Sequence, residues 1–426
     1  MIIQGGRRLS WSDVEERAAA ISKALPASNR IAVTLDNRLE SMEIALAVLR
    51  SGKTLIPVPD FLPKAARVAI MATARTRVRI GVGTGRIDPS RDDYEALMRV
   101  PASRLDGDGR MCFASSGTEG RPRLYVHQWS HLSRYLSALD LVDWGYAPGG
   151  RVVNNAPFAV GAGIFQGIIA LHHGTDMVVD LERPNSGRTA ELIREHGARS
   201  LVANPRTIAG LPGEDLGDLE VVLSSTNTLP LVTQQEFLSA HPNRTLVNIY
   251  SCTEGGIVSS KTITEPTECI GAPYPAANVQ IRNQEDGVGE VVIQGDSCAV
   301  GEFSWRGFTS WTAAHTGDLA CLDDNGEMWL RGRRSDKVVT SGYTVYTTQI
   351  ERALLEIEGV SEAAVIGVSD PDKGQELVGF YVGSASAETL IEGLRLRVPF
   401  YAIPRALNRI EELPMSPAGK VVKRSL

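Results

Sequence analysis

The N-terminal part of the chain alternates between helical and strand patterns, and this alternation restricts the fold more than any other feature. Apolar side chains recur at helical spacing in two segments, and short apolar runs separate and follow them. A capping-box pattern, Ser12 followed by Glu15, marks the start of the first helix. The expected elements are helices over residues 10–25 and 41–49 and strands over residues 31–35 and 54–58. This order predicts an open α/β sheet.

The pattern changes after residue 270, where glycine, proline and short alternating runs become frequent. Residues 289–295 alternate like a strand, and residues 323–326 read Asp-Asp-Asn-Gly, a turn signal between two such runs. We therefore expect a small, barrel-like antiparallel part after the α/β subdomains. A chain of 426 residues also exceeds what one hydrophobic core usually organises, so two or more domains are expected.

A charged segment precedes a compact pattern near the C-terminus. Thr348 is placed to cap a helix, with Glu351 in the matching third position. The expected elements that follow are strands over residues 363–368 and 377–382 and a helix over residues 387–397. We predict a large N-terminal domain over residues 1–334 and a small, mobile α+β domain over residues 335–426, with a hinge near Ser335.

Composition narrows the classes of function. The formal net charge is −6, which disfavours general nucleic-acid binding. No apolar run approaches the ~20 residues that span a bilayer, and the N-terminus lacks a signal-peptide pattern. The five cysteines are scattered and form no CxxC pair. Reduced thiols in a cytoplasmic protein are therefore expected, rather than disulfides or a zinc site.

A polar loop at residues 113–123, Phe-Ala-Ser-Ser-Gly-Thr-Glu-Gly-Arg-Pro-Arg, is the strongest functional signal. Glycine lets the backbone approach an anion closely, and successive N–H groups and hydroxyls can surround phosphate oxygens. Arg121 and Arg123 would add charge-assisted contacts. A surface turn would explain the same composition. The Walker A spacing is absent, which disfavours an ordinary P-loop ATPase.

This loop resembles the signature loop of the acyl-adenylate-forming superfamily, which includes acyl- and aryl-CoA synthetases, peptide-synthetase adenylation domains and firefly luciferase. The family loop usually reads Ser-Gly-Thr-Thr-Gly-Lys-Pro-Lys. Here Glu119 stands in place of a threonine, and Arg121 and Arg123 in place of lysines. The resemblance implies that Arg123 contacts the triphosphate. It implies phosphate contacts also for Ser115, Ser116, Gly117, Thr118 and Gly120.

Residues 248–254, Asn-Ile-Tyr-Ser-Cys-Thr-Glu, resemble the family's Asn-x-Tyr-Gly-x-Thr-Glu motif. The match implies that Tyr250 lies near the adenine, that Thr253 contacts the α-phosphate and that Glu254 holds Mg²⁺. A carboxylate suits this hard cation, which prefers oxygen ligands. The family's adenine-contacting turn corresponds in position to Ser225, Thr226 and Asn227.

Trp311 and residues 316–319, Thr-Gly-Asp-Leu, resemble a motif whose aspartate binds both ribose hydroxyls. A carboxylate is a suitable double acceptor for a diol, and the match assigns this role to Asp318. The family's Gly-Arg motif assigns a second ribose contact to Arg333. Ser335 stands where the family hinge residue, Asp or Lys, is usual.

Residues 341–346, Ser-Gly-Tyr-Thr-Val-Tyr, resemble a family loop that lines the tunnel for the thiol. The match places Gly342 and Tyr343 in that tunnel. Residues 413–420 resemble Leu-Pro-x-Thr-x-x-Gly-Lys, which makes Lys420 the catalytic lysine. The motifs occur in family order from about residue 8 to the end of the sequence.

The resemblance implies ATP-dependent activation of a small carboxylic acid as an acyl-adenylate, followed by transfer to a thiol. ATP and Mg²⁺ are the expected cofactors. The expected acceptor is coenzyme A or the phosphopantetheine arm of a separate carrier protein, because no carrier domain follows Lys420. The acyl pocket is expected at Phe158, Val160 and Gly161, where the aspartate that holds an amino acid's ammonium group is missing. An aryl, fatty or small branched acid is therefore favoured over an amino acid.

Other interpretations remain open from the sequence. A non-catalytic nucleotide-binding relative would be consistent with the departures at Glu119, Arg123 and Ser335. A third possibility is transfer of the acyl group to an acceptor other than a thiol. The protein is expected to be a monomer or a homodimer, and Lys423 and Arg424 are expected in a solvated tail.

Overall fold

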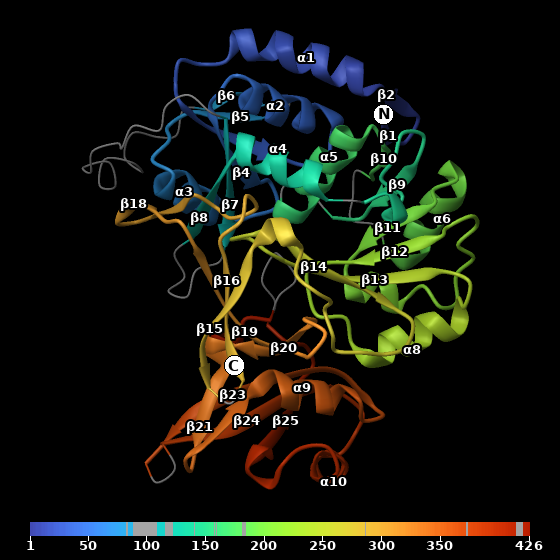
Figure 1. Ribbon diagram of the computed structural model, residues 1–426, viewed down its shortest axis with the longest axis vertical. Coiled ribbons are helices and arrows are strands. Elements are labelled where there is room, and N and C mark those ends of the chain that lie inside the picture. Colours follow the sequence, from blue (N-terminus) through green and yellow to red (C-terminus); the bar gives the residue numbers. More distant parts are fainter. Residues whose placement is uncertain are drawn as a thin grey trace.

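The structure is a computed structural model with a larger part at the top of Figure 1 and a smaller part, coloured orange to red, at the bottom. The described part of the chain forms four β-sheets, and most of its helices pack on the first two. The residues described are 1–81, 84–87, 109–115, 122–139, 141–156, 158, 160–180, 185–285, 287–371, 374–414 and 421–426.

The first sheet has the strand order β14-β13-β12-β11-β9-β10-β1-β2. Pairing is parallel from β13 to β1, and the two edge strands, β14 and β2, are antiparallel. Strands such as β11 and β12 are buried along their whole length, as expected where helices cover both faces. The strands are β1 (Ile2–Gln4), β2 (Arg7–Leu9), β9 (Arg151–Asn154), β10 (Asp176–Val178), β11 (Ser200–Ala203), β12 (Val221–Ser224), β13 (Thr245–Cys252) and β14 (Gly256–Ile263).

The second sheet has the order β18-β17-β8-β7-β4-β3-β5-β6. Its centre, from β5 to β7, is parallel, which confirms the open α/β sheet predicted from the N-terminal sequence. The strands are β3 (Arg30–Leu35), β4 (Thr54–Pro59), β5 (Arg79–Gly81), β6 (Thr84–Ile87), β7 (Arg110–Ser115), β8 (Arg123–Gln128), β17 (Gly301–Ser304) and β18 (Gly307–Ser310).

One hydrophobic core joins these two sheets. It contains Val33 from the second sheet, Val152 and Ile249 from the first, and helix residues such as Met42 and Tyr135. Figure 1 shows α4 and α5 between the sheets and α1 and α2 above them. The helices are α1 (Trp11–Ala24), α2 (Leu39–Arg50), α3 (Lys64–Thr73), α4 (Trp129–Ala138), α5 (Gly161–His173), α6 (Ser186–His196), α7 (Pro205–Ala209), α8 (Leu231–Ala240), α9 (Thr347–Leu355) and α10 (Ala387–Arg395).

The third sheet is antiparallel throughout, with the order β15-β16-β19-β20. The expected turn at residues 323–326 joins β19 to β20. The change from parallel to antiparallel structure after residue 270 is therefore confirmed. The strands are β15 (Val279–Glu285), β16 (Val288–Ile293), β19 (Ala314–Leu322) and β20 (Met328–Arg333).

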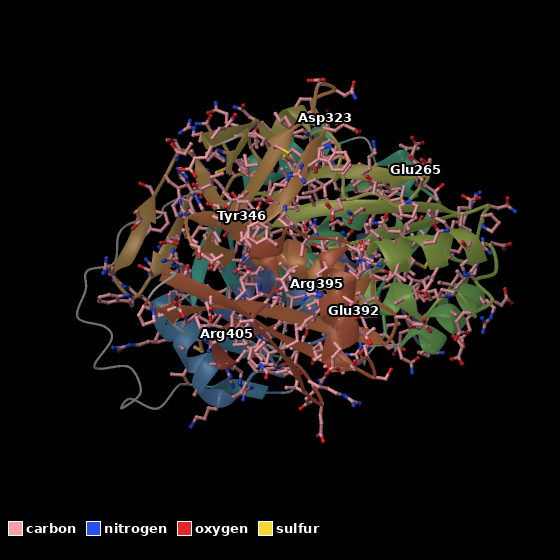
Figure 2. The ribbon with its side chains drawn as sticks, turned by 90° about the horizontal axis from the view of Figure 1, so that it is seen from below. Glu265, Asp323, Tyr346, Glu392, Arg395 and Arg405 are labelled. Atoms are coloured by element: carbon pink, nitrogen blue, oxygen red, sulfur yellow. The ribbon has the colours of Figure 1, made fainter. Side chains whose placement is uncertain are left out.

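The fourth sheet forms the smaller part together with α9 and α10. Its order is β22-β21-β24-β23, with β25 paired to β24, and it has a hydrophobic core of its own. Figure 2 views this part from below and shows Glu392 and Arg395 on α10, in front of the larger part. The strands are β21 (Lys337–Thr340), β22 (Tyr343–Tyr346), β23 (Val360–Asp370), β24 (Gly374–Gly383) and β25 (Ala406–Arg409).

These four sheets confirm the α/β fold class, with a large N-terminal part and a small C-terminal α+β part. β20 ends at Arg333, a short 3₁₀ turn (η4, Arg334–Asp336) follows, and β21 begins at Lys337. The domain division between residues 334 and 335 stays a prediction. None of the described helices is both long enough and apolar enough to cross a membrane.

Both predicted helix caps are wrong. Ser10, not Ser12, caps α1, because Ser10 is extended and its side chain accepts the Asp13 N–H, while Asp13 bonds back to the Ser10 N–H. The same spacing of serine and acid thus occurs twice, two residues apart. Thr348 lies inside α9, and its hydroxyl donates to the Arg331 carbonyl (3.2 Å) instead of capping the helix.

Replacing Ser10 by alanine should lower the free energy of unfolding by about 1 kcal/mol, since it removes a reciprocal helix cap. Ser12→Ala is the matched control, because Ser12 is exposed within the helix and is expected to change the stability by less than about 0.5 kcal/mol. Urea unfolding followed by circular dichroism compares the two variants. Equal midpoints for both would contradict the observed cap.

Candidate active site

Eight of the predicted site residues follow parallel strands of the first sheet. The carboxyl ends of such strands meet at one edge, where ligands bind in open α/β sheets. The loops after β9, β12 and β13 all begin at this edge. They carry the predicted residues Phe158, Val160 and Gly161, then Ser225, Thr226 and Asn227, and finally Thr253 and Glu254.

Tyr250, Asp318 and Arg333 form the best-defined group in the site. The Tyr250 hydroxyl donates to Asp318 Oδ2 at 2.8 Å, and Arg333 Nε lies 2.9 Å from Asp318 Oδ1. The group joins two sheets, because Tyr250 belongs to β13, whereas Asp318 and Arg333 are paired across β19 and β20. Three predicted residues that are far apart in the sequence are therefore brought into direct contact.

Asp318 is 6% exposed, and its carboxylate forms an ion pair with Arg333. Its negative charge raises the pKa of Arg333, while burial, followed by the charge of Asp318, raises the pKa of Tyr250 well above its usual value. Tyr250 thus stays protonated and acts as a donor. Each carboxylate oxygen has a second lone pair, so Asp318 can still accept from a diol.

The turn that carries Asp318 is fixed by its own backbone. The Thr316 hydroxyl donates to the Val291 carbonyl (2.9 Å) and accepts the Asp318 N–H (3.0 Å). Gly317 has φ +72°, a left-handed conformation that favours glycine. The conformation of this turn therefore favours threonine at 316 and glycine at 317 even without a ligand.

Glu254 lies next to this group, directly after β13. Burial raises the pKa of its carboxyl group, while its own backbone N–H and a hydrogen bond from Tyr125 act in the opposite direction. Asp318 raises the pKa of Glu254 further, and Arg333 lowers it. These mutual effects place Glu254 within the electrostatic reach of the Tyr250–Asp318–Arg333 group.

Residues of β8 hold the Thr253–Glu254 segment from the second sheet. His127 Nε2 donates to the Thr253 carbonyl at 2.8 Å, and the Tyr125 ring packs against Trp311 with ring centroids 5.9 Å apart. Sequence reasoning missed both β8 side chains. The period-two spacing of 125 and 127, immediately after the phosphate loop, would have placed them on one face of the strand.

The predicted phosphate loop connects β7 to β8. Ser115 pairs with Arg123 across this hairpin, and Arg123 Nη1 lies 3.7 Å from Glu302 Oε2. The Arg123 side chain is half exposed, so it is open to a ligand. The predicted residues Ser116, Gly117, Thr118 and Gly120 lie outside the described residues, as does Lys420.

The segments on either side of Lys420 are held together at their base, where the Val422 N–H donates to the Pro414 carbonyl at 2.7 Å. Lys423 does not lie in a solvated tail. Its ammonium group contacts Asp336 (3.2 Å), Glu351 (2.8 Å) and the Thr347 hydroxyl (2.9 Å). In Figure 1 the C-terminus accordingly lies between the larger and smaller parts.

The expected acyl-pocket residues lie around the start of α5. The Phe158 side chain is 1% exposed and belongs to the hydrophobic core. Its backbone N–H donates to Asn37 Oδ1 at 3.0 Å. A Cβ atom at Gly161 would lie 3.1 Å from the Phe113 ring, which leaves little room for any larger residue. Thr226, after β12, has φ +83°, an unusual conformation for a threonine.

Gly342 lies in the turn between β21 and β22, and Tyr343 is the first residue of β22. Gly342 has φ +84°. The Tyr343 ring stacks on Tyr401 (centroids 4.2 Å apart) and meets Phe400 edge to face. These ring contacts of Tyr343 are made within the smaller part.

Comparison of the sequence with known protein families gives two matches, one for the larger part and one for the smaller part. Residues 1–301 match the family model described as AMP-binding enzyme, and residues 349–420 match the model of the AMP-binding enzyme C-terminal domain. The chain belongs to the AMP-binding enzyme family. The matched segments together include Tyr250, Glu254 and Lys420, whereas Asp318 and Arg333 lie between them.

Among relatives of this AMP-binding enzyme is a 3-[(3aS,4S,7aS)-7a-methyl-1,5-dioxo-octahydro-1H-inden-4-yl]propanoyl:CoA ligase from Rhodococcus jostii. It is 24% identical over all of this chain and 94% of its own length. The solved amide bond synthetase McbA from Marinactinospora thermotolerans has a TM-score of 0.83 at 20% identity, covering 100% of this chain and 95% of its own.

A third similar protein is o-succinylbenzoate coenzyme A synthetase from Bacillus subtilis, solved with ATP and magnesium ion. Its TM-score is 0.84 at 18% identity, and the alignment covers 100% of this chain and 96% of that one. At such identities the two solved structures establish a shared fold.

The site of this AMP-binding enzyme suits a magnesium ion at one carboxylate. Glu254 offers a hard oxygen donor whose charge is disfavoured by burial until a cation approaches. Within the described ranges, no three His, Cys, Asp or Glu side chains gather as a metal site. Glu254 would therefore hold Mg²⁺ together with nucleotide phosphate oxygens, an arrangement usual for this ion.

Asp318→Asn should weaken AMP binding about tenfold, because it removes the charged acceptor of two donors inside the site. Tyr250→Phe is the matched variant. It removes one donor and keeps the ring, so a smaller loss of affinity is expected. Isothermal titration with AMP measures both, and an Asp318→Asn protein that binds AMP as tightly as wild type would exclude the assigned role.

Proposed function

We propose that the protein uses ATP to convert a small carboxylic acid into an acyl-adenylate and then transfers the acyl group to a thiol. The observation that carries this proposal is the contact of Tyr250, Asp318 and Arg333 beside Glu254, in a chain of the AMP-binding enzyme family. A buried carboxylate that offers two acceptors suits a ribose diol, and a second carboxylate nearby suits the ion that accompanies a triphosphate.

The reaction needs little covalent chemistry from the protein. Hydroxide is a poor leaving group, so the substrate carboxylate first attacks the α-phosphorus of ATP and pyrophosphate leaves. A thiolate then attacks the acyl carbon, and AMP leaves with the electron pair of the broken bond. Catalysis is positioning and charge neutralisation in the first step.

The roles of the residues follow from this scheme. Asp318 and Arg333 would hold the ribose, and Tyr250 would lie near the adenine, close to the turn of Ser225, Thr226 and Asn227. Thr253 and Arg123 would contact phosphate, with the loop that starts at Ser115. Glu254 would hold Mg²⁺, which neutralises triphosphate charge when it is bound.

Lys420 would join the carboxylate and the α-phosphate in the first step. We assign residues 1–334 to the nucleotide and acid domain and residues 335–426 to a domain that turns about Ser335 between the steps. Such a rotation would withdraw Lys420 and bring the Gly342 turn to the acyl-adenylate. The acceptor would be coenzyme A or a carrier-protein phosphopantetheine arm.

Exchange of labelled pyrophosphate into ATP, run with a panel of carboxylic acids, tests the first step. We expect exchange with at least one aryl, fatty or branched acid and its loss when EDTA removes the divalent cation. AMP binding without exchange for any acid in the panel would favour a non-catalytic nucleotide-binding protein. Glu119, Arg123 and Ser335 differ from the residues that are usual at these motif positions, and these differences favour that second interpretation.

Lys420→Ala separates the two half-reactions. Adenylate formation should fall by about a hundredfold or more, as expected when one stabilising charge is removed from a transition state. Transfer from supplied acyl-adenylate to a thiol should change by less than about threefold. Rapid-quench assays of each half-reaction measure this, and an equal loss in both would overturn the rotation about Ser335.

A further inference from the structure

Glu302 is a largely buried acid on β17, and none of the roles above uses it. Its side chain is 15% exposed, and its Oε2 lies 3.7 Å from Arg123 Nη1. Within the described ranges, this oxygen accepts no hydrogen bond. The guanidinium of Arg123 therefore balances the charge of a carboxylate that water reaches only in part.

The register of the second sheet places both side chains on the face that meets the nucleotide site. Glu302 lies directly opposite Tyr125, whose hydroxyl is hydrogen-bonded to Glu254. Arg123 precedes Tyr125 by two residues on β8, and side chains at this spacing share one face of a strand. Glu302 and Arg123 are thus diagonal neighbours across two strands, a separation that long side chains bridge. Phe303, the next residue along β17, packs in a hydrophobic core on the opposite face.

Arg123 can serve a phosphate and Glu302 at the same time. Its side chain is 50% exposed, and the hairpin that it closes with Ser115 is the predicted phosphate loop. A guanidinium carries five N–H donors in a fixed plane, so one edge can face a carboxylate while another faces an anion. The ammonium group of a lysine, the usual residue at this motif position, is a compact point charge. The acid at 302 thus gives a physical reason for arginine at 123.

We infer that Glu302 is a positioning residue that holds the Arg123 guanidinium in place for the β- and γ-phosphates of ATP. The inference rests on the proposed function, which assigns Thr253 and Lys420 to the α-phosphate and leaves the outer phosphates to the hairpin. If Arg123 swung entirely onto a phosphate, the Glu302 carboxylate would stay buried without its charge partner, which is unfavourable. The pair therefore stays together, and Glu302 limits the directions that the guanidinium can take.

Two other roles of Glu302 lead to different expectations. A carboxylate that only stabilises the hairpin would affect all nucleotides alike, because its loss would disturb the site as a whole. A carboxylate that competes with phosphate for Arg123 would oppose ATP binding, so its removal would tighten that binding. A positioning residue acts through Arg123 and matters only for nucleotides whose phosphates reach this guanidinium.

Calorimetry with MgATP and with AMP, in the absence of any acid substrate, separates these roles. Glu302→Gln keeps the size of the side chain and removes its charge. We expect it to weaken MgATP binding about fivefold and to leave AMP binding within about twofold of wild type. Glu220→Gln is the matched control, since Glu220 also pairs with an arginine, Arg199, but directly precedes β12, at the edge of the first sheet opposite to the site. Both of its affinities should stay within about twofold of wild type.

A double-mutant cycle shows whether the effect passes through Arg123. Arg123→Gln should weaken MgATP binding about tenfold, and adding Glu302→Gln to it should change the affinity by less than about twofold. The positioning role is overturned, and the proposed function kept, by unchanged or tighter MgATP binding in Glu302→Gln, by an equal loss for AMP, or by an undiminished effect in the Arg123→Gln background. A wild type that binds neither nucleotide overturns the proposed function as well.

Discussion

The carboxylate of Asp318 is the interaction on which the arrangement of the site depends. It binds Tyr250 from the first sheet and Arg333 from the third, so one buried charge fixes the relative position of two sheets. Removing either partner would leave the buried Asp318 carboxylate with one donor fewer, although the Arg333 side chain is itself 54% exposed. The group that we propose to bind the ribose therefore also links two sheets, and a substitution there should affect both.

The larger part prepares this site by sharing one core between two sheets. Strands from both sheets end near Thr253 and Glu254, and His127 bridges them at the Thr253 carbonyl. β8 of the second sheet and the end of β13 of the first sheet therefore meet at one place. The phosphate hairpin comes from the second sheet, Tyr250 from the first, and Asp318 and Arg333 from the third, which explains why the motifs are so far apart in the sequence.

The sequence predicted the elements that depend on local pattern and the residues that belong to motifs. The strands at β3 and β4, the helices α1 and α2, and the choice of Tyr250, Asp318 and Arg333 as motif residues were accessible in this way, whereas the contacts among these three residues came from the structure. The helix cap was not, because Ser10 and Ser12 are both followed by an acid three residues later and only the end of β2 selects the first.

The remaining residues depend on partners that no local pattern encodes. Glu302 meets Arg123 across strands from different parts of the sequence, and Lys423 meets Asp336 from 87 positions away. Tyr125 and His127 look like ordinary strand residues until β13 is placed beside them. Their roles follow from tertiary packing, and the sequence alone could not assign them.

The smaller part has its own hydrophobic core, and charged groups bridge it to the larger part. Arg352 lies 2.8 Å from Glu268, and Lys337 lies 3.0 Å from Glu285. Each of these ion pairs can therefore be replaced by separately hydrated charges without opening the hydrophobic core of the smaller part. In the Lys337–Glu285 pair the glutamate is 78% exposed, and surface charges of this kind are screened by salt over roughly 8–10 Å at physiological ionic strength. This link between the two parts should therefore weaken as the salt concentration of an assay rises.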